Sequence, residues 1–172
     1  YKMTRPLGHG SYGEVAEAID GQTGRRVAIK RIQHIFDQLV DAKRIYREIY
    51  ILRRLKHSQV VDLLDVIVPD GRRRMTDLYL VFEFVDTDLY KLILSAQYLS
   101  TPHVQTFLYQ ILVGLKFMHS ANVIHRDVKP ANILLNEDCS LKVRILWRFP
   151  LPNWRHCIHV SVRICWCLFA DL

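Results

Sequence analysis

The chain has 172 residues, of which 50% are hydrophobic and 24% charged, and its formal net charge is +7. This length and composition predict a globular chain with a real core and exclude a disordered one. The one dense basic run, Arg72-Arg73-Arg74, follows the turn Pro69-Asp70-Gly71 and is typical of a solvated loop, so we expect no nucleic-acid partner.

Targeting and membrane signals are not found. The first residues form no charged leader ahead of an apolar stretch, and the longest apolar run near the end, residues 164–170, is far shorter than the ~20 residues of a membrane span. Only Cys139 precedes residue 144, so we expect no disulfide framework. We expect a protein of the cytoplasm, with the nucleus as a second compartment, and no membrane partner.

The first half of the chain predicts strands. Residues 14–20 alternate with period two, residues 21–24 (Gly-Gln-Thr-Gly) form a turn, and residues 26–31 return, which predicts a β-hairpin. The elements expected next are a helix over about residues 36–55 and a strand pair over residues 60–68 and 78–84.

The second half predicts helix. Ser100-Thr101-Pro102 marks a helix start, with a hydroxyl cap and a proline in the first turn. A broad buried face is expected from apolar residues at helical spacing: Val104, Phe107, Leu108, Ile111, Leu112 and Leu115. A strand-rich front and a helical back predict an α+β, two-lobed fold with a hinge near residues 83–88.

Gly8, Gly10 and Gly13 have the spacing GxGxxG. Without Cβ atoms the backbone can approach phosphate oxygens and offer its N–H groups as donors. An ordinary glycine turn is one alternative, and a dinucleotide-binding turn, in which a helix follows, is another. Because residues 14–19 predict a strand, we favour a flap over the phosphates of ATP.

Glu48 falls on the apolar stripe of the first predicted helix, between the directions of Leu52 and Leu55. A buried carboxylate is costly unless it is paired. Lys30, at the end of an apolar strand, is the candidate partner, and the pair would hold its ammonium towards the α- and β-phosphates. The alternative is an exposed helix edge with a solvated Glu48.

The most specific pattern is His125-Arg126-Asp127, followed by Lys129 and Asn132. In this pattern Asp127 would orient the hydroxyl that receives the phosphoryl group, and Lys129 would neutralise charge developing on that group. Asn132 would bind one Mg²⁺ ion. The pattern therefore predicts phosphoryl transfer with ATP and Mg²⁺ as cofactors.

With these motifs, residues 1–143 resemble the front part of a eukaryotic protein kinase domain, and most closely the mitogen-activated protein (MAP) kinases. The resemblance implies a protein kinase fold with a complete β-rich N-lobe over residues 1–85 and the start of a helical C-lobe over residues 86–143. It also implies a serine/threonine protein kinase with protein substrates and an upstream activating kinase. Further stretches that carry it are residues 42–49, 86–92, 107–112 and 119–124.

The resemblance implies Phe82 as the gatekeeper, residues 83–85 as the adenine-binding hinge, and Asp88 near the ribose. Asp127 and Lys129 are the expected catalytic residues, and Asn132 is the expected metal ligand. The expected nucleotide-binding residues are Leu7, Gly8, His9, Gly10, Ser11, Tyr12, Gly13, Glu14, Val15, Ala28, Lys30, Glu48, Glu83, Val85 and Asp88.

The chain departs from the family after residue 143. A metal-binding Asp-Phe-Gly is expected at positions 145–147, where the chain reads Ile145-Leu146-Trp147, and neither a Thr-x-Tyr nor an Ala-Pro-Glu motif occurs. Since Tyr1 would already lie in the first strand, we also interpret the N-terminus as truncated. We expect the 172-residue chain to be inactive, and the alternative function is a catalytically dead kinase-fragment interaction module.

Residues 144–172 hold all three tryptophans and three of the four cysteines, and we interpret them as a non-homologous tail. An unspliced intron or a frameshift is our hypothesis, because Lys142-Val143-Arg144 can be encoded across a splice donor. A zinc cluster is the alternative, although its spacing matches no standard ligand pattern. Its ligands would be His156, Cys157, His159, Cys165 and Cys167.

Overall fold

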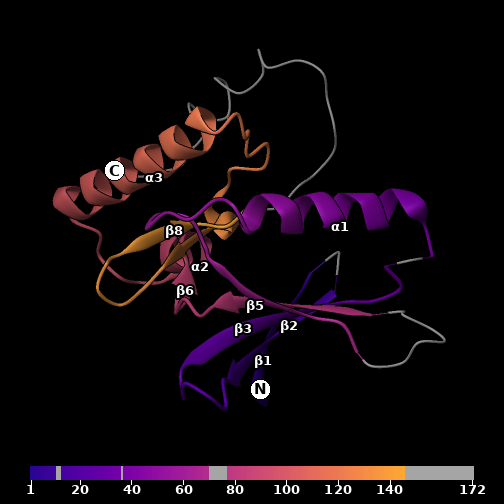
Figure 1. Cartoon of the computed structure of the whole chain (residues 1–172). Coiled ribbons are helices and arrows are strands. Elements are labelled where there is room, and N and C mark those ends of the chain that lie inside the picture. Colours follow the sequence, from indigo (N-terminus) through magenta and orange to yellow (C-terminus); the bar gives the residue numbers. More distant parts are fainter. Residues whose placement is uncertain (11–12, 36, 70–76, 146–172) are drawn as a thin grey trace. The chain divides into compact units, whose positions relative to one another are not determined.

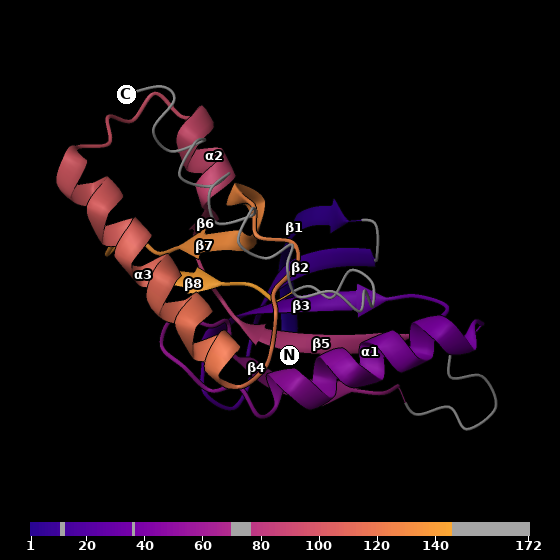
Figure 2. The same ribbon diagram turned by 90° about the horizontal axis from the view of Figure 1, so that it is seen from above.

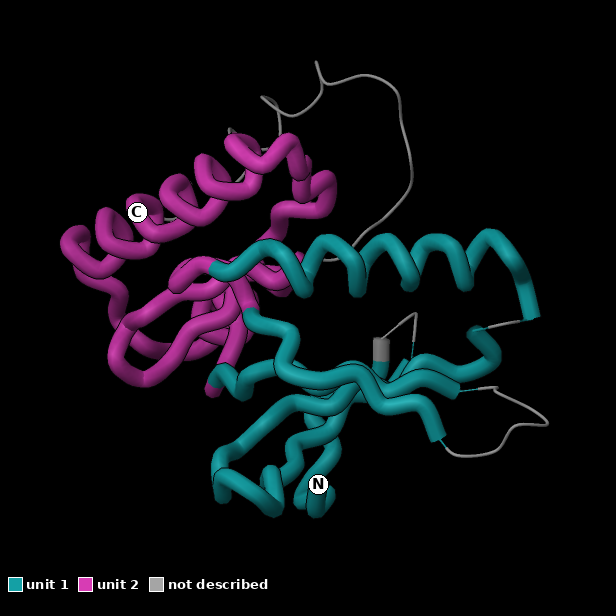
Figure 3. The backbone as a smooth tube through the Cα atoms, in the orientation of Figure 1, with its two compact units in different colours: residues 1–56, 62–85 teal, residues 57–61, 86–172 magenta. Residues whose placement is uncertain are grey.

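The computed structural model describes residues 1–10, 13–35, 37–69 and 77–145, and the chain divides into two compact units (Figure 3). The first unit comprises residues 1–56 and 62–85. The second comprises residues 57–61 together with the described residues from 86 onward. The strand-rich first unit and the second unit with its long helix confirm the predicted α+β class.

A five-stranded antiparallel sheet forms the first unit, in the order β1-β2-β3-β5-β4 (Figure 1). Its strands are β1 (Lys2–Gly10), β2 (Gly13–Ile19), β3 (Arg26–Ile32), β4 (Leu63–Ile67) and β5 (Leu78–Glu83). The predicted hairpin is confirmed as β2 and β3, and the predicted strand pair as β4 and β5. Ala18, Val27, Ile29 and Val81 form a buried cluster on this sheet.

The turn between β2 and β3 is organised by Asp20. Its carboxylate accepts hydrogen bonds from the Gln22 N–H at 3.0 Å and from the Thr23 hydroxyl at 2.6 Å. Gly24 has a φ of +68°, a left-handed conformation that glycine adopts without the steric cost of a Cβ atom. The polar, glycine-bounded sequence of this turn therefore fixes the hairpin locally.

The helix of the first unit, α1 (Leu39–Leu52), is shorter than the predicted helix over residues 36–55. Residue 36 lies outside the described residues, and Gln38 is already extended. At the other end the Arg54 N–H donates to the Ile51 carbonyl, three residues back, at 2.9 Å. Such tighter turns are common at helix ends, and hydrophobic periodicity does not reveal them.

The second unit contains the three-stranded antiparallel sheet β6-β7-β8 and two α-helices. The elements are β6 (Thr87–Asp88), α2 (Leu89–Leu94), α3 (Thr101–Ser120), the short 3-10 helix η1 (Pro130–Asn132), β7 (Ile133–Leu135) and β8 (Leu141–Val143). Figure 2 shows α3 running alongside β8.

Among the described residues, no helix is long and apolar enough to cross a membrane.

Val60 and Val61 were predicted to begin the strand over residues 60–68, and this boundary is wrong. β4 begins at Leu63, and residues 57–61 bind β8 instead. The Val143 N–H donates to the Gln59 carbonyl at 2.8 Å, and the Val61 N–H donates to the Val143 carbonyl at 3.1 Å. Apolar character alone could not separate the two stretches, because Val60, Val61 and Leu63 are all buried although they bind different strands.

The predicted start of α3 is confirmed: Ser100 is the N-cap, and its N–H donates to Nδ1 of His103 at 3.3 Å. The predicted buried face is narrower than expected, because Leu108 is half-buried and Leu112 is exposed. A narrow stripe spaced by three and four residues is enough for packing on one neighbouring surface. The buried residues of α3 are Val104, Phe107, Ile111, Gly114, Leu115 and Met118.

Truncating two adjacent residues of α3 to alanine tests this stripe. Ile111 is 1% exposed and Leu112 is 51% exposed. We expect Ile111→Ala to lower the free energy of unfolding by about 2–5 kcal/mol, because it removes buried apolar surface and leaves a cavity. Leu112→Ala, the matched control, should change it by less than about 0.5 kcal/mol. Urea unfolding measures both, and equal losses would contradict the observed face.

Candidate active site

The Lys30–Glu48 pair joins β3 to α1 within the first unit. Lys30 Nζ lies 3.9 Å from Glu48 Oε1, and Glu48 is only 4% exposed. Burial of a carboxylate on the apolar side of a helix is tolerated when a cation compensates it. The prediction that these two residues pair is therefore confirmed.

The glycine-rich segment joins β1 to β2. Gly10 pairs with Gly13 and Gly8 with Val15 in the antiparallel register. A Cβ atom on Gly13 would lie 1.8 Å from the Arg31 carbonyl oxygen, and Gly13 has a φ of +130°, so only glycine fits. The prediction that a strand follows the last glycine is confirmed.

Other predicted nucleotide-binding residues are distributed around this hairpin. Leu7 and Val15 are half-buried, and Glu14 lies opposite His9, with Oε1 3.9 Å from His9 Nδ1. Ser11 and Tyr12 lie outside the described residues. These positions agree with a flap formed by a hairpin, and their contact with nucleotide stays a prediction.

The predicted hinge residues fall where the two units meet along the chain. Ala28 pairs with Phe82 in the β3–β5 register, and Glu83 ends β5. The Glu83 carboxylate accepts a hydrogen bond from the Asp62 N–H at 2.7 Å. Val85 is the last residue of the first unit.

Asp88, which is predicted to lie near the ribose, precedes the first residue of α2 and binds the first turn of that helix. It is the N-cap of α2, where its Oδ1 accepts a hydrogen bond from the Lys91 N–H at 2.9 Å. Its Oδ2 lies 3.5 Å from Lys91 Nζ. A contact with ribose stays a prediction for this carboxylate.

His125 begins the predicted catalytic loop and is 2% exposed. Its Nδ1 accepts a hydrogen bond from the Asp127 N–H at 3.2 Å, so the proton resides on Nε2, which donates to the Arg144 carbonyl at 2.8 Å. Burial lowers the pKa of His125 below its ordinary value, although the hydrogen bond to the Arg144 carbonyl acts in the opposite direction. A neutral His125 is thus a structural support of the loop.

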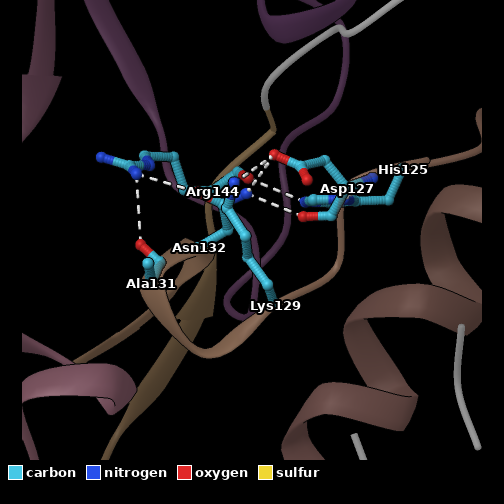
Figure 4. Close-up of polar contacts among 6 residues, drawn as sticks. All are labelled: His125, Asp127, Lys129, Ala131, Asn132 and Arg144. Atoms are coloured by element: carbon cyan, nitrogen blue, oxygen red, sulfur yellow. Dashed lines mark hydrogen bonds and ion pairs between the residues drawn. The ribbon is translucent and has the colours of Figure 1, made fainter. Parts of the chain in front are cut away.

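Asp127, Lys129 and Asn132 meet in the second unit (Figure 4). Asp127 Oδ2 lies 3.0 Å from Lys129 Nζ and accepts a hydrogen bond from Asn132 Nδ2 at 2.9 Å. The same Asn132 nitrogen donates to the Asp127 carbonyl at 2.7 Å. These contacts fix the carboxylate through Oδ2, and Oδ1 takes part in none of them.

Arg144 is the site residue that the sequence did not indicate. Its Nη2 donates to Asn132 Oδ1 at 2.9 Å and to the Ala131 carbonyl at 3.1 Å (Figure 4). Its N–H donates to the Asn132 carbonyl at 2.9 Å. An isolated arginine after a short strand carries no sequence signal for such a role, and the break in composition at residue 144 pointed away from it.

The expected Mg²⁺ ligand set does not fit this arrangement. Mg²⁺ takes six oxygen ligands in near-ideal octahedral geometry and usually keeps several waters. Asn132 is 0% exposed, its oxygen already accepts from a guanidinium, and position 145 holds a buried isoleucine. The described residues also contain no group of three His, Cys, Asp or Glu side chains placed to hold a metal. The alternative zinc ligands between residues 156 and 167 lie outside the described residues.

Comparison with known proteins agrees with these features. A sequence model of the protein kinase domain matches residues 1–145. Extracellular signal-regulated kinase 1 of Dictyostelium discoideum is 50% identical over 143 residues, which are 83% of this chain and 27% of that protein. Mitogen-activated protein kinase 5 of Arabidopsis thaliana is 53% identical over 139 residues, which are 81% of this chain and 37% of that protein.

A third relative, mitogen-activated protein kinase 1 of Oryza sativa subsp. japonica, is 51% identical over 138 residues, which are 80% of this chain and 35% of that protein. The chain therefore spans between 27% and 37% of the length of these three relatives. The resemblance to the MAP kinases that the motifs indicated is confirmed.

The buried His125 makes stability depend on pH in a predictable direction. Its pKa is lowered in the folded state, whereas the unfolded chain titrates near pH 6.5, so the unfolded state binds the proton first. The stabilisation is fully present above about pH 6.5 and is lost as the pH falls below it, with a slope of at most about 1.4 kcal/mol per pH unit.

Urea unfolding at several pH values measures this loss. His125→Gln should flatten the dependence, and His119→Gln, at an exposed histidine of α3, should leave it unchanged. An unaltered slope in His125→Gln would contradict the assignment of the neutral imidazole.

Proposed function

Because the chain belongs to the protein kinase family, whose sequence model it matches over residues 1–145, we propose that it is part of a serine/threonine kinase of the MAP kinase type. The reaction is transfer of the γ-phosphoryl group of ATP to a serine or threonine hydroxyl of a protein. The observation that supports this most directly is the contact of Asp127 with Lys129 at 3.0 Å and with Asn132 at 2.9 Å.

Each residue of the site has a role that follows from its charge and contacts. Asp127 is held through Oδ2, so its other oxygen can orient the attacking hydroxyl. Lys129 supplies positive charge for the phosphoryl group in transfer. Lys30, held by Glu48 at 3.9 Å, binds the phosphates that remain on the nucleotide.

The partners proposed for the whole protein are protein substrates and an upstream activating kinase. Support comes from the relatives, whose names describe kinases that are themselves activated by mitogens or regulated by extracellular signals. The location in the cytoplasm and nucleus stays a prediction.

The 172-residue chain itself is proposed to be inactive in phosphoryl transfer. Members of the family in general use Mg²⁺ with ATP, and a carboxylate of the Asp-Phe-Gly motif holds the metal. Here position 145 is an isoleucine that is 2% exposed, and the oxygen of Asn132 accepts a hydrogen bond from Arg144.

The same two observations favour a second candidate function, a catalytically dead interaction module. Such a module would keep the kinase fold and its partner surfaces without turnover. The presence or absence of phosphoryl transfer separates the two functions.

A chimera tests both proposals. Residues 1–143 of this chain would be joined to the remaining C-terminal part of mitogen-activated protein kinase 5 of Arabidopsis thaliana, which is 53% identical over 139 residues. After activation, the chimera should phosphorylate a generic protein substrate, and the 172-residue chain should not.

Asp127→Asn in the chimera should lower turnover by about 10²–10⁴-fold, because proton transfer is lost, while the affinity for ATP changes by less than about threefold. Turnover and ATP affinity are measured side by side. Equal losses in both would mean that Asp127 is misassigned, and turnover by the 172-residue chain would contradict its proposed inactivity.

A further inference from the structure

Arg144 contacts the predicted catalytic loop through both its backbone and its side chain. The Arg144 N–H donates to the Asn132 carbonyl at 2.9 Å, and the side chain returns to the same residue, with Nη2 2.9 Å from Asn132 Oδ1. Nη2 also donates to the Ala131 carbonyl at 3.1 Å. Arg144 thus binds η1 through main-chain and side-chain contacts together.

Both the oxygen and the nitrogen of the Asn132 side-chain amide make hydrogen bonds. Its Oδ1 accepts from Arg144, and its Nδ2 donates to the Asp127 carboxylate and carbonyl at 2.9 and 2.7 Å (Figure 4). Asn132 is 0% exposed, so these partners replace water completely. A positive charge therefore stands on the oxygen side of the amide and a negative charge on its nitrogen side.

A divalent cation on Asn132 Oδ1 would have to share that oxygen with the guanidinium. Mg²⁺ binds oxygen at about 2.1 Å, and Nη2 lies at 2.9 Å, so ion and nitrogen would be at most about 5 Å apart. Two cations at that separation repel each other strongly away from bulk water. Isoleucine at position 145 offers no carboxylate that would offset the repulsion.

We propose that Arg144 is a resident cation that replaces the divalent metal at Asn132, so that this chain binds ATP without a divalent cation. This rests on the proposed function for the identity of the nucleotide. The proposal goes beyond that function, because it assigns to a residue of this chain the position that Mg²⁺ has in the family. Mg²⁺ then gains no bond to Asn132, and its presence adds nothing to ATP affinity.

The 172-residue chain itself is the material for the test. ATP affinity is measured by calorimetry in a magnesium buffer and in an EDTA buffer of equal ionic strength. We expect the two dissociation constants to agree within about twofold. Affinity that falls by about tenfold or more in EDTA would overturn the proposal.

Two variants of Arg144 examine the role of the charge. Arg144→Gln keeps an amide that can donate to Asn132 but removes the charge, and ATP binding should then become about tenfold tighter with Mg²⁺ than with EDTA. Arg144→Lys keeps the charge and should stay independent of metal. Metal independence in the Gln variant, or a metal requirement in the Lys variant, would overturn the assignment to the Arg144 charge.

Lys116→Gln is the matched control, because it removes one positive charge from an exposed position of α3. It should behave as the unaltered chain does, and a metal requirement here would mean that net charge rather than Arg144 is responsible. Absence of ATP binding in both buffers would overturn the proposed function and this inference together. Metal-dependent binding by the unaltered chain would overturn this inference alone.

Discussion

Asn132 has no exposed surface, and the organisation of the loop of residues 125–132 depends on how its side-chain amide makes its hydrogen bonds. A buried amide that lacks partners costs as much as a lost hydrogen bond or more, so both of its ends must be matched. Asp127 accepts from its nitrogen and Arg144 donates to its oxygen. One neutral side chain thereby couples an acidic and a basic residue that are 17 positions apart in the sequence.

The position of Arg144 follows from the packing of the second unit. β8 ends at Val143, and that residue exchanges backbone hydrogen bonds with Gln59 and Val61. On α3, a Cβ atom added to Gly114 would lie only 3.0 Å from the Gln59 carbonyl, which shows how closely this helix approaches. The loop of residues 125–132 is thus supported by residues 57–61, which belong to the second unit although they interrupt the first unit in the sequence.

Local patterns predicted much of the fold and part of the site. The β2–β3 hairpin and the start of α3 follow from alternation, glycines and a hydroxyl cap, and each is decided by neighbours in sequence. The pairing of Lys30 with Glu48 could be predicted because a charge on an apolar stripe needs a partner.

The features that were missed depend on tertiary contacts. Whether Leu112 is buried depends on what lies beside α3, and whether Val60 joins β4 or β8 depends on the path of the chain. Arg144 carries no local signal, since its role comes from the residue that it faces. Periodicity and motif spacing contain none of this information.

The central claim, that an arginine holds the place of a metal at Asn132, is tested most directly by a crystal structure of the 172-residue chain soaked with Mn²⁺. Anomalous scattering locates the ion without reference to any assumed ligand. We expect the Arg144 guanidinium to contact Asn132 Oδ1 and no anomalous peak within bonding distance of that oxygen. A peak bonded to Asn132 Oδ1, with Arg144 displaced, would contradict the account.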